Sequence, residues 1–475
     1  MVHWSFDVRP NQTYWYYGSG RLVSGRVTAF QETQRIRHYS ALELVQYGSG
    51  CLNEDHGMTP SRPLRVLQLA VTDHGGAGMA CIRLHRAFLG LNVDSRVLVR
   101  RLYGSDEGIT QAGSRWNAAL RFRLDRLPLY LYPRKNVFGW WSVNWLPDTP
   151  RTEFGDWQPD IVHAHWIGDG YIPVEWFAKA GRPVVWTMHD MWPFTGGCHY
   201  AQDCLRYETG CGECPQLGST SKRDMSFRSA ARKARAWGSA NGVTIAPSLW
   251  LADVARKSSV LRNTRIEVIP YGLDGSVFRP ANRADARKRL GLPQGDRILL
   301  TGAVNALKDE RKGFGLLKEA LRVCYASGGT ENWRLLVFGA DAGPGVETIG
   351  IPVSYCGTVS GDRDLATIYQ ACDVFALPSL QDNLPNTAIE ALACGKPVVA
   401  YRSSGLATMI QDGRTGWLAE PFSSASLAIA IRNAMEASFG AEWSAACREE
   451  FDRTYAWPGP THRHLRLYEE MLRNK

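Results

Sequence analysis

The sequence predicts an α/β protein with two domains, each built on a parallel sheet. Three observations point to this fold class. The chain has 475 residues, enough for two domains. Short apolar runs typical of buried strands alternate with helix-compatible stretches along most of its length. The segment 377–400 reads as a strand end, a turn, a helix, a second turn and a new strand, which is the βαβ unit of a parallel sheet.

Residues 1–60 are rich in aromatic side chains and are expected to form an N-terminal extension. The run Tyr14–Tyr17 precedes Gly18 and Gly20, a pattern that favours short strands or an added hairpin. Two interpretations stay open for this extension. It is a structural addition packed on the first domain, or a surface that contacts a partner or an acceptor.

The first domain is expected to begin with the buried strand Leu64–Val71. A glycine-rich turn over Thr72–Gly78 follows, and it leads into a helix from Met79 to about Leu89. Glycines in such a turn let the backbone approach a phosphate, or let the helix pack closely on the sheet. The spacing of these glycines differs from the dinucleotide-binding fingerprint.

Two further strands of this domain carry histidines at their carboxyl ends. They are Asp160–His165 and Val184–Asp190. Open parallel sheets place their sites at such strand ends, so His189 lies where chemistry is expected. His163 and His165 are interpreted as structural.

The region 100–150 mixes basic and aromatic side chains, and between Asn117 and Tyr132 its apolar residues recur near helical spacing. A basic, aromatic, amphipathic stretch suits the plane of a membrane surface. The alternative is a helix that buries its apolar side on its own domain. The residues concerned are Arg115, Trp116, Arg121, Phe122, Arg123, Arg126, Tyr130, Tyr132, Arg134, Lys135, Phe138, Trp140, Trp141 and Trp145.

Four cysteines follow within a short loop, at positions Cys198, Cys204, Cys211 and Cys214. The final Cys-x2-Cys pair is of the kind that binds zinc, and four thiolates make a closed tetrahedral structural site. Two disulfides or four free thiols are the alternatives. A site with four cysteine ligands leaves no open position on the metal, so the loop is interpreted as structural or acceptor-shaping.

Composition and charge narrow the function further. The chain is 44% apolar and 21% charged, as in soluble globular proteins, and it has no apolar run long enough to span a membrane. Its N-terminus does not resemble a signal peptide, so a cytoplasmic location with mostly reduced thiols is expected. The net charge of +9 favours acidic partners, but no motif of a nucleic-acid-binding module is present.

The second domain is expected to open with the strand Arg297–Thr301. Lys312 and Gly313 then precede a helix over Phe314–Tyr325. A lysine before a glycine at a helix start is a cation directed at a phosphate. A solvated charge cluster is the ordinary alternative.

Pro385 suits the first position of a helix, because its missing N–H would have no intrahelical partner there, and an anion site is predicted at the start of this helix. The backbone N–H groups of Asn386 and Thr387 have no intrahelical acceptor there. Two carboxylates, Asp382 and Glu390, bracket this position. Carboxylates accept hydrogen bonds from sugar hydroxyls, so the arrangement suits a sugar nucleotide, with a sugar and a ribose on either side of a diphosphate. The alternative is an ordinary βαβ unit with surface acids.

This segment resembles the E-x7-E element of the retaining glycosyltransferases of family four, which have the two-domain GT-B architecture with Rossmann-like domains facing across a cleft. The similarity runs over roughly residues 64–470. It implies that Glu390 holds the donor ribose and Asp382 the donor sugar, where the family usually has Glu. It also implies that Lys312 contacts the diphosphate and that His189, within Thr187-Met-His189, lies against the sugar.

The resemblance implies further donor contacts. An arginine that usually precedes the lysine is absent, because Ala306 and Leu307 stand there, and Arg311 or Lys308 is the expected substitute. The run 192–217 resembles a loop of colanic-acid and exopolysaccharide glycosyltransferases. The catalytic residues implied are Lys312, His189, Asp382 and Glu390. The donor-binding residues implied are Gly75, Gly76, Arg311, Asn383, Leu384, Asn386, Thr387 and Val359.

The expected domains are the extension 1–60, an acceptor domain 61–280, a donor domain 281–455 and a helix 456–475 that crosses back to the first domain. The expected function is retaining transfer of a sugar from a nucleoside diphosphate to a glycan or polyprenyl-linked acceptor, in surface polysaccharide synthesis. No catalytic cofactor, no nucleic-acid partner and a cytoplasmic or peripheral inner-membrane location are expected. The alternatives are a sugar-nucleotide epimerase on the same fold and a non-catalytic carbohydrate-binding protein.

Overall fold

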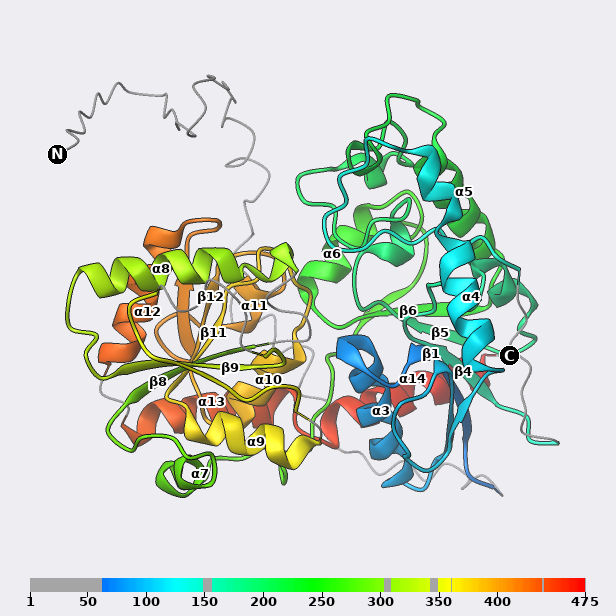
Figure 1. Cartoon of the computed structure of the whole chain (residues 1–475). Coiled ribbons are helices and arrows are strands. Elements are labelled where there is room, and N and C mark those ends of the chain that lie inside the picture. Colours follow the sequence, from blue (N-terminus) through cyan, green and yellow to red (C-terminus); the bar gives the residue numbers. More distant parts are fainter. Residues whose placement is uncertain are drawn as a thin grey trace. The chain divides into compact units, whose positions relative to one another are not determined.

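The computed structural model describes residues 62–147, 156–302, 309–341, 349–359, 361–437 and 440–474. The predicted extension 1–60 and the candidate Lys308 lie outside these residues. Within them the chain forms two α/β lobes, each built on one all-parallel sheet (Figure 1). The predicted fold class, with two Rossmann-like parallel-sheet units, is therefore confirmed.

The first sheet has seven strands in the order β3-β2-β1-β4-β5-β6-β7. The chain order reverses between β1 and β4, which pair directly, and ligand sites of open α/β sheets lie at such a switch point. The strands are β1 (Arg65–Thr72), β2 (Asp94–Arg101), β3 (Ile109–Gln111), β4 (Ile161–Ala164), β5 (Val184–Thr187), β6 (Gly242–Ala246) and β7 (Ile266–Val268).

Three of the four α-helices described in the first lobe begin at polar caps that the sequence supplies, and α3 is the exception. The Ser114, Asp224 and Ser248 side chains each accept a hydrogen bond from a backbone N–H three residues later. The α-helices are α3 (Gly75–Leu89), α4 (Arg115–Asp125), α5 (Met225–Gly238) and α6 (Leu249–Lys257). The short 3-10 helices are η1 (Leu127–Leu131), η2 (Val174–Lys179), η3 (Trp192–Phe194), η4 (Arg206–Glu208) and η5 (Pro215–Leu217).

The second sheet has six strands in the order β10-β9-β8-β11-β12-β13. They are β8 (Arg297–Gly302), β9 (Trp333–Phe338), β10 (Val353–Tyr355), β11 (Val374–Leu377), β12 (Val398–Tyr401) and β13 (Gly416–Ala419). The helices after β7 are α7 (Arg283–Arg289), η6 (Glu310–Lys312), α8 (Phe314–Ala326), α9 (Asp362–Ala371), α10 (Asn386–Ala393), α11 (Leu406–Met409), α12 (Ser424–Glu436), α13 (Ala441–Thr454) and α14 (Gly459–Arg473).

Both faces of the second sheet are buried, which explains why its central strands are mostly apolar. Successive side chains of β8 enter different clusters: Ile298 packs with residues of α9, α10 and α13, whereas Leu299 packs with residues of α8 and α12. Figure 1 shows α8 and α12 on one side of this sheet and α9, α10 and α13 on the other.

The last helix, α14, packs on the first lobe. Leu467, Tyr468 and Met471 are buried in one cluster with Val66 of β1 and Val185 of β5. The Tyr468 hydroxyl also lies 2.6 Å from Nδ1 of His163, at the carboxyl end of β4. The chain therefore ends against the lobe in which its described part begins.

Two local predictions were wrong. The glycines placed in a turn form the first turn of α3, which begins at Gly75. Position 78 requires glycine, because a Cβ there would lie 2.5 Å from the Thr72 carbonyl oxygen. Pro385 precedes α10 as its N-cap instead of occupying its first turn. No helix in the described part of the chain is long and apolar enough to span a bilayer.

Candidate active site

A buried charge cluster lies in the second lobe, between η6 and the loop that joins β11 to α10. Asp382 is 7% exposed, and its Oδ2 atom accepts a hydrogen bond from Nζ of Lys312 at 2.7 Å. The guanidinium of Arg311 lies 3.4 Å from the same oxygen. Burial alone would raise the pKa of Asp382, but Lys312 and Arg311 outweigh it and hold that pKa well below the ordinary value. The predicted residues Lys312, Arg311 and Asp382 are thus brought together.

Two glycines make this proximity possible. Gly313 ends η6 with φ of +69°, and a Cβ there would lie 1.9 Å from the Pro378 carbonyl oxygen. Gly405 also lies against this loop, where a Cβ would lie 1.5 Å from the Asn383 carbonyl oxygen. Any side chain at either position would push the loop away, so the loop that carries Asp382 is fixed at both contacts.

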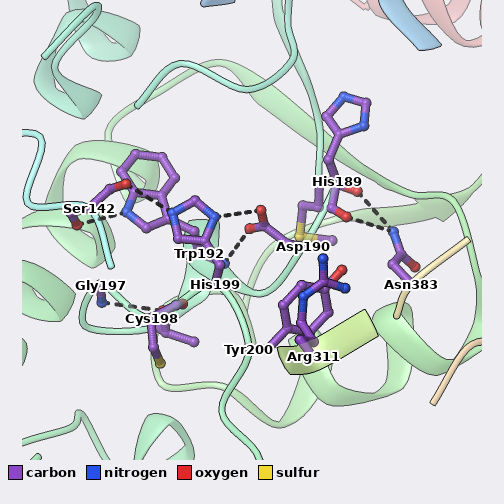
Figure 2. A network of polar contacts seen from close by, with 12 residues as sticks. Ser142, His189, Asp190, Trp192, Gly197, Cys198, His199, Tyr200, Arg311 and Asn383 are labelled. Carbon is purple, nitrogen blue, oxygen red and sulfur yellow. Dashed lines mark hydrogen bonds and ion pairs between the residues drawn. The ribbon is translucent and has the colours of Figure 1, made fainter. Parts of the chain in front are cut away.

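Tyr200 brings the first lobe into this cluster. Its hydroxyl donates to Oδ1 of Asp382 at 3.2 Å, and the guanidinium carbon of Arg311 lies 4.6 Å from the centre of its ring. Tyr200 stands in the cysteine-rich loop next to His199, whose Nδ1 lies 2.7 Å from Oδ2 of Asp190 (Figure 2). The contact between Asp190 and His199 anchors the start of this loop near the end of β5.

Asn383 makes a second connection between the lobes. Its Nδ2 group donates to the carbonyl oxygen of His189 at 3.2 Å, as Figure 2 shows, and its Oδ1 accepts from the Ser248 hydroxyl at 2.6 Å. Asn383 is 1% exposed. The Asn383 side chain, predicted to bind the donor, therefore makes its hydrogen bonds to the first lobe.

The ring of His189 belongs to a chain of buried hydrogen bonds. Its Nε2 lies 3.1 Å from Nδ1 of His165, and its Nδ1 lies 2.7 Å from the Tyr271 hydroxyl. Nε2 of His165 faces Oε1 of Gln68 at 3.0 Å, and an amide oxygen only accepts. The proton of His165 is therefore on Nε2, so His189 donates through Nε2 and accepts from Tyr271. Burial lowers the pKa of His189 to about 4, which leaves the ring neutral at neutral pH.

The N-termini of α3 and α10 lie together. Nδ2 of Asn386, in the first turn of α10, donates to the carbonyl oxygen of Gly76, in the first turn of α3, at 2.9 Å. One turn further along α10, Oε1 of Glu390 accepts from Nη1 of Arg83 on α3 at 2.7 Å. Two contacts in the same sequence order mean that both helices run in the same direction past each other. Neither N-terminus has a side-chain cap.

Glu390 is 3% exposed, and protein groups contact both of its carboxylate oxygens. Arg83 contacts Oε1, and the Tyr369 hydroxyl donates to Oε2 at 2.9 Å. Arg83 also donates to Oδ1 of Asp362 at 2.8 Å. Each carboxylate oxygen has two lone pairs, so these contacts hold Glu390 in place and leave acceptor capacity for a sugar hydroxyl.

The remaining predicted donor-binding residues lie around these groups in different ways. Leu384 is buried in the core of the second lobe, so its backbone is the part that can meet a ligand, whereas Val359 is partly buried against the same core. Thr387 stands in the first turn of α10, where its N–H has no intrahelical acceptor. Gly75 opens α3 with φ of +73°, and a Cβ on Gly75 or Gly76 would meet no atom within 4 Å.

The four cysteines of the loop line one small cavity of about 20 Å³. Each of them is a free thiol in the structure, which differs from the alternative of two disulfides. Across the described ranges, no three His, Cys, Asp or Glu side chains form a group that could hold a metal ion. The geometry lends the zinc prediction no support, and elemental analysis of the purified protein is its direct test.

Three residues of the site were missed in the sequence: Arg83, Tyr200 and Tyr369. Arg83 lies in the middle of α3, and only the glycine-rich start of that helix was predicted to contact the donor. Tyr200 lies in the loop that was interpreted from its four cysteines as a metal-binding or structural segment. Tyr369 lies in α9, for which no role was predicted. Each one contacts Glu390 or Asp382 from another element, at separations of 307, 182 and 21 positions, and no local pattern marks such a pair.

Two family models match the chain, one in each lobe. The model described as Glycosyltransferase Family 4 matches residues 74–276, and the model described as Glycosyl transferases group 1 matches residues 295–437. The first spans most of the seven-stranded sheet, and the second spans the whole six-stranded sheet.

Curated relatives carry glycosyltransferase names. The D-inositol 3-phosphate glycosyltransferase of Acidothermus cellulolyticus is 33% identical over 194 residues, which is 38% of this chain and 42% of that protein. The protein of the same name from Mycobacterium tuberculosis is 30% identical over 223 residues, 44% of each chain. The match therefore spans less than half the length of these relatives.

Solved structures share the fold at low sequence identity. Sucrose-phosphate synthase from Thermosynechococcus elongatus has a TM-score of 0.63 at 18% identity, covering 87% of this chain and all of that one. Anabaena HepE, solved with UDP and glucose, has a TM-score of 0.58 at 16% identity, covering 86% of this chain and 99% of that one. With a family model on each lobe and this two-lobed fold, the chain belongs to the GT-B glycosyltransferases of family four.

Proposed function

We propose that this chain is a retaining glycosyltransferase that moves a sugar from a nucleoside diphosphate to an acceptor hydroxyl. The observation that carries the proposal is the meeting of two uncapped helix N-termini, α3 and α10, through the contact between Asn386 and Gly76. The N-terminus of a helix carries a partial positive charge and free N–H groups, so two of them at one place favour an anion such as a diphosphate.

The groups on either side of this anion site suit the rest of a sugar nucleotide. Glu390 lies one turn along α10, held by Arg83 and Tyr369, and we assign it to the ribose hydroxyls. Asp382 lies in the loop before α10, held by Lys312 and Tyr200, and we assign it to the donor sugar. Proteins of similar fold were solved with related ligands, Anabaena HepE with UDP-glucose and Arabidopsis starch synthase IV with ADP, which supports such a donor.

The proposed reaction needs no nucleophile from the protein. The bond between the anomeric carbon and the diphosphate oxygen breaks, and a bond from the acceptor oxygen forms on the same face. The acceptor's proton passes to the departing diphosphate. Lys312, Arg311 and the helix N–H groups stabilise the negative charge that grows on that diphosphate, so no catalytic metal is required.

The acceptor we propose is a hydroxyl of a glycan or of a polyprenyl-linked sugar, as in surface polysaccharide synthesis. The loop that carries Tyr200 and the four cysteines belongs to the first lobe and contacts Asp382 through Tyr200. This position suits a segment that shapes the acceptor site. Inositol phosphate is the comparison acceptor, because the curated relatives are named for it.

The test is release of nucleoside diphosphate by the purified full chain from a panel of nucleoside-diphosphate sugars. The panel is run with no acceptor, with membrane lipid extract and with D-inositol 3-phosphate. Product release that depends on an acceptor, with the anomeric configuration retained in the product by NMR, supports the proposal. Conversion of the donor without an acceptor would indicate an epimerase instead. Donor binding without any turnover would indicate a carbohydrate-binding protein.

A further inference from the structure

Large apolar side chains are concentrated on one exposed part of the first lobe. Fourteen large hydrophobic residues are exposed among the residues that the structure describes, and half of them fall between positions 116 and 145. They are Trp116, Leu120, Leu127, Tyr130, Leu131, Trp140 and Trp145, and we call them the aromatic face. Trp116 is 88% exposed and Leu131 is 80% exposed, so these side chains are not packed on their own domain.

Three of the seven residues of the aromatic face follow one helical stripe. At about 100° per residue, Trp116, Leu120 and Leu127 point within roughly 40° of one another along α4 and into η1. The side of α4 that is buried carries Ala118 and Asp125 instead. Figure 1 shows α4 in cyan, lying beside the first sheet. The predicted alternative, a helix that buries its apolar side, holds only in part, because Ala118 and Leu129 are buried while Trp116, Leu120 and Leu127 are exposed.

Positive charge is interspersed with the aromatic face, whereas acidic residues are rare in its segment; the acidic Glu175, which pairs with Arg232, lines a pocket with Trp145 at its edge. Arg115, Arg123, Arg134 and Lys135 are exposed within the same segment. The only acidic residue between positions 112 and 147 is Asp125, which is 1% exposed and accepts backbone N–H groups of Asn144 and Trp145. Arg126 stacks its guanidinium on the Trp140 ring at 4.7 Å, so cations and aromatic rings alternate across the surface.

We infer that the aromatic face is a docking surface for an anionic lipid bilayer. Trp and Tyr favour the boundary between headgroups and acyl chains, the leucines enter the apolar layer, and Arg and Lys reach anionic headgroups with their charged ends. A nucleic acid would use the cations but not the exposed leucines. A second copy of this chain would bring the same positive charge against itself. The inference rests on this surface alone and holds whatever reaction the donor site performs.

The test is co-sedimentation of the full chain with vesicles of phosphatidylcholine alone or mixed with phosphatidylglycerol. The wild-type chain is expected to bind the mixed vesicles, and added salt is expected to weaken the binding. The triple variant Trp116→Ser, Leu120→Ser, Leu131→Ser should lose binding by about tenfold or more. The matched control, Tyr325→Ser with Ile429→Ser, removes exposed apolar residues of the second lobe and should bind as the wild type does.

A charge variant tests the surface without removing any apolar side chain. Arg123→Gln with Lys135→Gln should weaken binding to the mixed vesicles and reduce its salt dependence, whereas Arg256→Gln with Lys257→Gln on α6 should not. Circular dichroism confirms that each variant is folded. Three results would overturn the inference: no binding of wild type to mixed vesicles, equal binding of the triple variant and its control, or a wild-type dimer that the triple variant converts to a monomer.

Discussion

At the scale of single residues, the site depends on cations that are held close to one carboxylate. Lys312 and Arg311 both contact Asp382, which remains ionised because they outweigh the effect of burial on its pKa. The ion pair keeps two positive charges in a poorly solvated place where they would otherwise be costly. A departing diphosphate next to them would replace water with fixed positive charge, which is the main way such a site lowers a reaction barrier.

Lys312→Ala should reduce kcat by about two orders of magnitude, because the lost cation stabilises charge that appears during bond breaking. Donor binding, measured by calorimetry, should change only a few fold. Lys257→Ala, an exposed lysine on α6, is the control and should leave both quantities unchanged. Equal losses in turnover and in donor affinity would contradict a role on the leaving group.

The pH dependence of kcat should show the charge of Lys312. Burial lowers the pKa of Lys312 below its ordinary value of 10.5, although Asp382 acts in the opposite direction. A lysine is charged below its pKa, so activity should be present at lower pH and be lost as the pH rises through this value. In Lys312→Arg the alkaline loss should move to higher pH, because a guanidinium stays protonated. An unshifted alkaline limb would assign it to another group.

At the scale of elements, α3 and α10 form the joint between the lobes. Asn386 meets Gly76 at the helix starts, and Glu390 meets Arg83 further along. Arg83 is 3% exposed, and it contacts Asp362 of α9 as well as Glu390. The same carboxylate that we assign to the ribose is therefore part of the contact that aligns the two helix N-termini.

A double-mutant cycle measures this joint. Arg83→Met alone should lower the free energy of unfolding by about 3 kcal/mol, because it leaves the buried Glu390 unpaired. Combined with Glu390→Gln, the loss should be smaller than the sum by about 0.5 kcal/mol or more, as urea unfolding would show. Arg265→Met, which breaks an exposed pair with Glu470, should add to Glu390→Gln without coupling. Additive losses for both pairs would contradict a direct contact in solution.

The position of α14 gives a second prediction at this scale. Tyr468→Ala should lower the free energy of unfolding by about 3 kcal/mol or more, because Tyr468 fills the cluster between β1, β5 and α3. Glu469→Ala, the exposed neighbour on the same helix, should cost little. A small loss for Tyr468→Ala, measured by thermal unfolding, would mean that α14 does not pack on the first lobe in solution.

At the scale of the whole molecule, both lobes contribute to one electrostatic site. The second lobe supplies Lys312, Arg311 and the start of α10, while the first lobe supplies the start of α3 and the Tyr200 hydroxyl. The fold places these groups at the carboxyl ends of the strands, since α3 follows β1 and the loop before α10 follows β11. The proposed donor site is thus complete only when both lobes are in contact.

Activity should therefore survive removal of divalent metals. Turnover after treatment with EDTA and exhaustive dialysis is expected to stay within about twofold of the untreated enzyme, because protein cations stabilise the leaving diphosphate. Magnesium is added back in a parallel assay, as the control that shows whether the reaction uses a metal bound to the donor. Loss of activity that magnesium restores would show that the cations of the site are not sufficient.

Local sequence determined the two sheets and much of the donor loop. The interiors of β1, β8 and β11 are mostly apolar, because strands buried on both faces have no polar side. The helix after Pro385 was recognisable from Pro, Gly and the residues between them. The carboxylates Asp382 and Glu390 were recognisable from their spacing around it.

Tertiary structure alone decided which side chains those carboxylates contact. Glu390 and Arg83 are 307 positions apart, and Asp382 and Tyr200 are 182 apart. A pattern in sequence reflects contacts within a helix or a strand, whose spacing is fixed by backbone geometry. Contacts between lobes depend on how two sheets and their helices pack, so Arg83, Tyr200 and the exposed side of α4 became evident only once the chain was folded.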